Sequence, residues 1–255
     1  MTAAAYKSKP SPKLAEHDRR FIFHLEMRQG SPECALECND YSVRRAATML
    51  DYMGTASLVK QMYSRRGYLT ENIPTVPRRD DTITLDAHDA QQVMGTLTVR
   101  LDSHEGGLLA DALYAKEIDG FRAGGRKVCE VSKLAVDPTY GSKELMASLF
   151  QLAYLYAHVV YSASDAFIEV NPRHAGFYKR MLGFEEIGDR RICPRVNAPA
   201  VLLHVELEYM RRQIALHSGR GCCTGEKSLY PYFLSCSAED WIDRALRAKA
   251  NKKPH

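Results

Sequence analysis

Apolar positions are densest between Lys127 and His158, where their spacing predicts a strand, a turn and a long helix. Aliphatic residues dominate the strand, and Asp137-Pro138 must end it because proline has no N–H group for a sheet ladder. In the helix, apolar residues occupy most of the surface, which indicates packing on several sides: Leu145, Met146, Leu149, Phe150, Leu152, Ala153, Leu155 and Tyr156. We therefore expect this unit at the centre of the core.

The remaining segments alternate between strand and helix patterns. Strands are predicted at residues 21–27, 82–86, 92–102, 165–172, 184–188 and 200–208, and helices at 41–68, 108–118, 174–182 and after Ser237. Gly54 should divide the first helix, whose apolar stripe would include Leu50 and Met53, and Gly183 should provide a left-handed cap. This order predicts an α/β (α+β) fold with a mixed central sheet flanked by helices. We expect one domain over residues 19–208, no fixed structure in residues 1–18 and a helical extension over residues 209–255.

Arginine doublets recur along the chain, whose formal net charge is +4. They belong either to an ordinary solvated surface or to a docking site for an acidic partner. Nucleic acid is disfavoured because no binding motif or concentrated basic stripe accompanies them. The doublets are Arg19-Arg20, Arg44-Arg45, Arg65-Arg66, Arg78-Arg79, Arg190-Arg191 and Arg211-Arg212.

The seven cysteines are an odd number, which indicates free thiols in a reducing compartment, and the cytoplasm is the expected location. We predict no metal site, because no cysteine or histidine pair has the spacing of a zinc ligand set. The first residues lack the apolar core of a signal peptide, and no run approaches the roughly 18 apolar residues that span a bilayer.

One acidic residue, Glu130, interrupts the apolar central strand. A carboxylate in such a strand is either a satisfied structural group or a catalytic base. The turn around Gly141 leads directly into the buried helix, and the free N–H groups of a helix start favour a phosphate. These two features make the strand and turn the candidate active centre.

The order of elements resembles the GNAT-type N-acyltransferase fold. Two segments carry the resemblance: Leu134-Ala-Val-Asp-Pro138 before the turn, and Phe177-Tyr-Lys-Arg-Met-Leu-Gly-Phe184 later in the chain. Glu130-Val-Ser-Lys133, Asn171-Pro-Arg-His and Arg195-Val-Asn-Ala-Pro199 resemble more narrowly the long-chain N-acyl amino acid synthases of the FeeM type. These enzymes are related to the acyl-homoserine lactone synthases. The glycine-rich turn of coenzyme A users is reduced here to Gly141, so fewer close approaches to a pyrophosphate are possible.

The resemblance implies an acyltransferase with no bound cofactor, whose donor is a thioester on the phosphopantetheine arm of acyl carrier protein rather than on coenzyme A. The acceptor would be the α-amine of an amino acid. An acidic carrier would suit the arginine doublets, and membrane contact would come only through the lipid product. Acyl-homoserine lactone synthase and coenzyme A-dependent N-acetyltransferase are alternatives on the same fold. A non-catalytic acyl-binding or interaction protein is an alternative of a different class.

N-acylation needs a base for the amine proton, donors for the developing oxyanion and an acid for the leaving thiolate. We expect Glu130 as the base and Tyr178, which matches a tyrosine of many GNAT enzymes, as the acid. Cys129 is disfavoured as a nucleophile, because it should point to the opposite face of the strand from Glu130. The expected amino-acid ligands are Arg100, Lys133 and Arg195. Pairing with a surface acid is the alternative for Arg100 and for Arg195. The expected acyl-donor site is Leu134, Ala135, Val136, Gly141, Ser142, Lys143, Leu145 and Leu149.

Overall fold

The structure is a computed structural model that describes residues 21–28, 31–71, 73–76, 81–103, 105–220, 227–235, 239–242 and 244. The predictions for residues 1–18 and for much of the C-terminal extension therefore lie outside the described residues.

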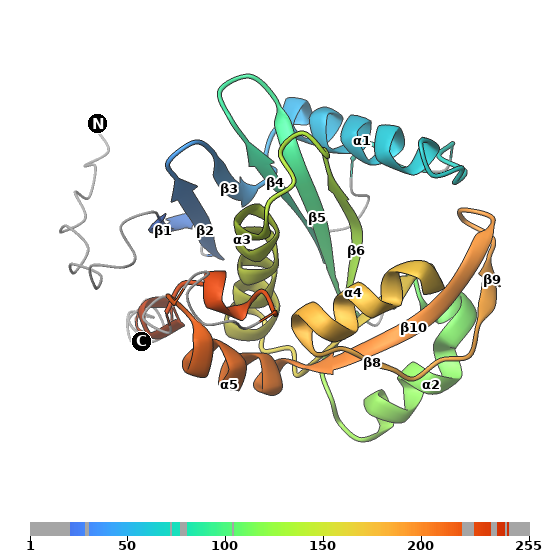
Figure 1. The fold of residues 1–255 in the computed structure, drawn as a ribbon. Coiled ribbons are helices and arrows are strands. Elements are labelled where there is room, and N and C mark those ends of the chain that lie inside the picture. Colours follow the sequence, from blue (N-terminus) through green and yellow to red (C-terminus); the bar gives the residue numbers. More distant parts are fainter. Residues whose placement is uncertain are drawn as a thin grey trace, which may run out of the picture.

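A large twisted sheet forms the framework (Figure 1). Its strands follow the spatial order β1-β2-β3-β4-β5-β6-β7-β10-β8, and β9 pairs with β10. Neighbouring strands are antiparallel except β6 and β7, which are parallel. The strands are β1 (Phe21–Arg28), β2 (Ser31–Cys38), β3 (Ser42–Arg45), β4 (Thr82–His88), β5 (Val93–Leu101), β6 (Val128–Val136), β7 (Asp165–Val170), β8 (Glu185–Glu186), β9 (Arg191–Cys193) and β10 (Ala198–Glu206).

Helices cover both faces of this sheet. They are α1 (Met49–Ser64), α2 (Asp111–Ala123), α3 (Lys143–Tyr154), which continues as a π-helix over Leu155–Val160, α4 (Pro172–Leu182) and α5 (Leu207–His217). Ala135 packs against α1, whereas the neighbouring Val136 lies with α3 against Gly95. Because consecutive strand residues point to opposite faces, α1 and α3 lie on opposite sides of the sheet.

The central strand, turn and buried helix are confirmed as β6 and α3. Eleven consecutive residues, from Ala147 in α3 to Ala157 in the π-helix, are at least 97% buried. The helix is enclosed because residues beyond the sheet cover its outer side. Gln151 exchanges side-chain hydrogen bonds with the backbone of Leu234, and Phe23 of β1 lies edge-on to Trp241. Segments from both ends of the described chain thus complete the core around α3 (Figure 1).

The predicted helix at residues 41–68 is wrong in its first part. Residues 42–45 form β3, and α1 runs without a break through Gly54, where a Cβ would lie 2.9 Å from Val93. Leu50 and Met53 are 78% and 55% exposed, because Leu58, Val59 and Met62 set the buried side of α1. The apolar spacing had merged a buried strand with a helix. The periodicity also missed β2 and β9, whereas α5 falls largely within the helical extension predicted over residues 209–255. Within α2, Tyr114 and Ile118 are buried and Ala112 is exposed.

Candidate active site

A cavity of about 940 Å³ opens where β6 and β7 diverge. The two strands pair over Val128–Glu130 and Asp165–Phe167, and within the described residues the pairing goes no further. Beyond this point β6 from Val131 to Val136 and β7 from Ile168 onward line the two sides of the opening. Separation of two parallel strands thus creates room for a ligand inside the sheet itself.

A β-bulge at Lys133 shapes the β6 side. Thr98 of β5 pairs with Ser132 and Thr96 with Ala135, so two residues of β6 face one residue of β5. Lys133 takes a φ of 52°, the left-handed conformation that non-glycine residues seldom adopt. Because of the bulge, Ala135 lies on the same face of the sheet as Glu130 and Ser132.

Glu130 lines the cavity in the last residue pair that joins β6 to β7, and it is 1% exposed. Its Oε2 accepts hydrogen bonds from the backbone N–H groups of Leu109, at 2.5 Å, and Ala110, at 3.2 Å, just before α2. Burial raises the pKa of Glu130 to about 7, although Arg195 and the two N–H groups act against it. A carboxyl group with this pKa is suited to accept a proton near neutral pH.

Arg195 is fixed beside Glu130 by two partners. Its Nη2 lies 2.8 Å from Oε2 of Glu169 on β7, and its Nη1 donates to the carbonyl of Leu109 at 2.6 Å. Glu169 was not among the residues predicted from the sequence, although it is an acid inside a buried strand, as Glu130 is. Because Arg195 already has these partners, it orders the Glu130 environment and is less free to take a substrate carboxylate.

Arg100 and Ser132 leave polar atoms unused in the same region. Arg100 is directly opposite Glu130 in the β5–β6 register, yet no ion pair joins them within the described residues. The Nε of Arg100 and the Oγ of Ser132 are buried without a hydrogen-bond partner in this part of the chain. Burial, and then the charge of Arg100, lowers the pKa of Lys133, which also lines the cavity. Unpaired buried donors of this kind indicate a subsite for a polar group of a ligand.

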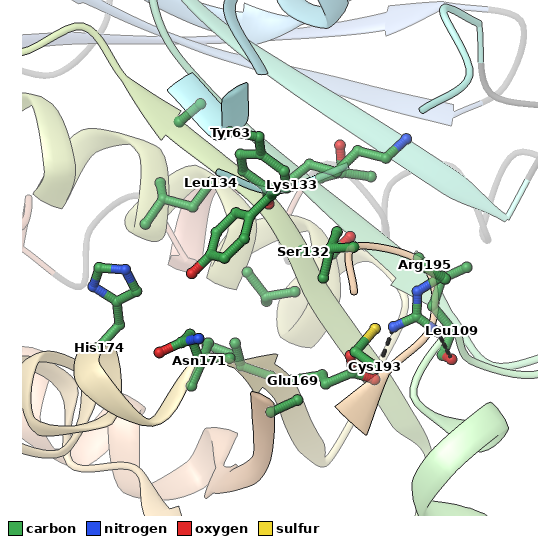
Figure 2. Close-up of a pocket in the computed structure, with 18 of the residues that line it drawn as sticks. Tyr63, Leu109, Ser132, Lys133, Leu134, Glu169, Asn171, His174, Cys193 and Arg195 are labelled. Atoms are coloured by element: carbon green, nitrogen blue, oxygen red, sulfur yellow. Dashed lines mark hydrogen bonds and ion pairs between the residues drawn. The ribbon is translucent and has the colours of Figure 1, made fainter. Parts of the chain in front are cut away.

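Tyr178 reaches the cavity from α4 and is 8% exposed. Its ring has edge contacts with Phe150, Phe177 and Phe184. Burial raises the pKa of Tyr178 above its usual range, so its hydroxyl stays protonated. Tyr63 from α1 also lines the cavity (Figure 2), and the sequence analysis missed it because it resembled an ordinary apolar helix position.

The predicted donor residues divide into two groups. Leu134, Ala135 and Val136 line the cavity, as does Met146 of α3. Leu145 and Leu149 do not: they are buried in the core, where a Cβ on Gly95 would lie 3.2 and 3.1 Å from them. Gly141, Ser142 and Lys143 are also outside the cavity lining; Ser142 caps α3 by accepting the N–H of Leu145, and Lys143 lies over the Tyr232 ring.

Two histidines and one buried thiol lie in or near this region. His174 also lines the cavity, at the opposite end from Arg195 (Figure 2). His204 is structural, with its Nε2 2.8 Å from Asp165. Burial raises the pKa of Cys129 well above its usual range, and this thiol is outside the cavity lining, which argues against a nucleophile there.

The described residues contain no cluster that could hold a metal ion and no helix long and apolar enough to cross a membrane.

Comparison with known proteins gives a family match. Residues 54–206, more than half of the chain, match the family model described as N-acyl amino acid synthase FeeM. A solved structure of FeeM, an N-acyl amino acid synthase from uncultured soil microbes, aligns with a TM-score of 0.62 at 26% identity, over 68% of this chain and 94% of that one. No curated protein matches the sequence.

Two further solved structures align more weakly. The acyl-homoserine lactone synthase LasI has a TM-score of 0.46 at 14% identity, over 66% of this chain and 89% of that one. An acyl-CoA N-acyltransferase from Pseudomonas aeruginosa has a TM-score of 0.45 at 13% identity, over 65% and 97%. The mixed sheet with flanking helices and the FeeM alignment confirm the predicted GNAT-type fold.

Proposed function

The chain belongs to the FeeM family of N-acyl amino acid synthases and is an acyltransferase, and we propose that it transfers a long-chain acyl group from acyl carrier protein to the α-amine of an amino acid. The observation that carries this proposal is Glu130, a buried carboxyl group with a pKa of about 7 in the lining of a large cavity. It provides the base that amine acylation needs, and a protein that merely binds an acyl chain has no use for it.

The transfer proceeds by direct attack. The amine nitrogen attacks the thioester carbonyl while Glu130 takes the amine proton, and the carbonyl oxygen becomes an oxyanion. Backbone N–H groups at the β6 bulge around Leu134, on the side where β7 no longer pairs, are suited to stabilise that oxyanion. The C–S bond then breaks, and Tyr178 protonates the departing thiolate. The products are the N-acyl amino acid and the free pantetheine thiol.

An α-amino acid fits the polar end of the cavity because its two functional groups are adjacent. Opposite residues in an antiparallel pair have Cβ atoms about 4.5–5.5 Å apart, so Arg100 and Glu130 lie side by side without pairing. In our proposal the acceptor amine faces Glu130 and its carboxylate binds Arg100, with Ser132 and Lys133 as further donors. Arg195 is a positioning residue in this arrangement, since Glu169 and Leu109 already hold it.

Replacing Arg100 should therefore weaken acceptor binding more than it slows chemistry. We expect Arg100→Ala to raise KM for the amino acid about tenfold to a hundredfold, the loss of a charged hydrogen bond worth about 1.5–3 kcal/mol. Steady-state kinetics with saturating donor measure this effect. Arg212→Ala on α5 is the matched control and should leave KM unchanged. An equal rise in KM for the amino acid and for its decarboxylated amine would show that Arg100 does not bind the carboxylate.

The acyl chain fits the apolar part of the cavity. The cavity volume is at the upper end of the roughly 300–1,000 Å³ range of ligand pockets. Its apolar lining comes from both faces of the sheet, including Met62 of α1, Ile168 of β7, Met146 of α3 and Phe177 of α4. A chain can therefore lie in the gap between β6 and β7 rather than along α3, where Leu145 and Leu149 are already packed.

A donor series tests the proposed function. With acyl carrier protein thioesters from acetyl to hexadecanoyl, we expect kcat/KM to rise with each methylene, by up to about 0.8 kcal/mol of binding, until the cavity is filled. Mass spectrometry should identify the product as an N-acyl amino acid. The same acyl groups on coenzyme A should react more slowly, and added salt should reduce the advantage of the carrier by screening. Transfer of acetyl as fast as of a long chain would disprove the long-chain assignment.

A further inference from the structure

Two arginines, Arg66 and Arg173, meet at His174, which lines the cavity. Arg66 follows the C-terminus of α1, and Arg173 lies in the first turn of α4. The Nη1 of Arg66 is 3.1 Å and the Nε of Arg173 is 3.2 Å from the Nε2 of His174. Arg173 also donates to the Tyr68 hydroxyl at 2.9 Å and covers its ring. Among the described residues, neither arginine forms an ion pair with an acid.

His174 holds these two cations together as a hydrogen-bond acceptor. Arginine has donors only, so Nε2 of His174 must present a lone pair to both guanidinium groups. Burial, followed by the charges of Arg66 and Arg173, lowers the pKa of His174 and keeps the ring neutral at neutral pH. The three side chains therefore form a positive cluster with no internal compensation, a situation that favours an anionic ligand.

We propose that Arg66 and Arg173 bind the phosphate of the phosphopantetheine arm of the donor. This inference rests on the proposed function and deepens it. His174, Asn171 and Leu134 lie toward one end of the cavity, and Arg195 and Leu109 lie toward the other (Figure 2). An arm whose phosphate lies at the His174 end can extend along β6, past Leu134, toward Glu130. Guanidinium groups match the geometry of phosphate oxygens and can bind them in a bidentate manner.

The start of α3, where the sequence analysis placed a phosphate, is less suited to this role. Ser142 already accepts the N–H of Leu145, and Lys143 is engaged with the Tyr232 ring. None of Gly141, Ser142 and Lys143 lines the cavity, whereas Arg66, Tyr68 and His174 do. Arg173 is outside the lining but contacts both Tyr68 and His174. The phosphate site therefore lies between α1 and α4.

Donors with and without a phosphate test the assignment. We expect Arg66→Ala and Arg173→Ala each to raise KM for acyl carrier protein about tenfold with little change in kcat. With an acyl thioester of N-acetylcysteamine, which has no phosphate, both variants should behave like the wild type. Arg180→Ala, an exposed arginine on the same helix, is the control. Equal losses on both donors, or a raised KM for the amino acid, would overturn the proposal, the latter by placing the acceptor carboxylate at this cluster.

A binding measurement separates this inference from the acyl transfer itself. Calorimetry should show 4′-phosphopantetheine binding to the wild type about tenfold more tightly than pantetheine, and the double variant Arg66→Ala, Arg173→Ala should lose that difference. Equal affinity of the wild type for both compounds would refute the site even if acyl transfer occurs. Inorganic phosphate binding as tightly as phosphopantetheine would identify a site for free phosphate instead. Failure of the wild type to acylate any amine, with this binding pattern intact, would contradict only the proposed function.

Discussion

Glu130→Gln should lower kcat for acyl transfer by about 10²- to 10⁴-fold, the usual effect of losing a general base. The amide is close in size to the carboxyl group and can still accept the N–H groups of Leu109 and Ala110, so the fold should persist. Because the pKa of Glu130 is about 7, the wild-type log kcat/KM should rise with pH and bend near that value. The variant should lack this bend. Single-turnover acyl transfer between pH 5 and 9 measures both effects.

Glu208→Gln is the matched control for this experiment. This substitution makes the same chemical change on an exposed helix surface, where Glu208 pairs only with Arg211 in the described part of the chain. Its rate and pH profile should equal those of the wild type. A Glu130→Gln enzyme with full activity would show that Glu130 is a structural carboxylate and that the amine loses its proton to solvent.

Asp165→Ala should lower the free energy of unfolding by about 3 kcal/mol. This value is at the lower end of the range for breaking a buried ion pair, because Arg126 still reaches water. Asp165 is fully buried at the start of β7 and accepts from Arg126 at 2.6 and 2.9 Å, from His204 at 2.8 Å and from Ser164 at 2.6 Å. Removing it leaves Arg126 and His204 without this partner, beside the three residue pairs that join β6 to β7. Urea unfolding monitored by circular dichroism measures the loss.

The same carboxylate makes stability depend on pH. Burial alone would raise its pKa, but the hydrogen bonds from His204, Arg126 and Ser164 hold the pKa of Asp165 well below its usual range. Its contribution is therefore complete above the unfolded value near 3.9 and is lost as the pH falls toward the folded value. Asp119→Ala, at an exposed acid of α2, should cost less than about 1 kcal/mol. An Asp165 variant as stable as this control would show that the network contributes little.

The alternation of apolar residues was sufficient to place the central unit. Long apolar runs ended by Asp137-Pro138 and by Gly183 give strand and helix boundaries from local physics alone, and Gly183 has the left-handed φ of 78° that its position requires. The first helix shows the limit of such patterns. A buried strand and a helix face can carry similar apolar spacing, so residues 41–68 were interpreted as one kind of element until strand pairing defined β3.

The spacing of apolar residues could not locate the cavity. Because α3 is apolar on nearly every side, its sequence cannot indicate which side meets a ligand, and Leu145 and Leu149 lie against Gly95 while Met146 reaches the cavity. The sequence also does not indicate which groups form hydrogen bonds to an isolated acid. Glu130 was singled out as an acid among aliphatic residues, but its backbone donors belong to a segment 20 residues earlier in the chain.

By itself, the sequence determined the order of most core elements, the position of Glu130 on the central strand and the resemblance to an acyltransferase family. These features depend on side-chain periodicity and on motifs of neighbouring residues. Only the tertiary structure decided where β6 and β7 separate, how Arg195 is held by Glu169, and that Arg66 and Arg173 meet at His174. Each of these depends on residues distant in the chain whose approach is set by strand pairing and packing, and a single sequence records neither.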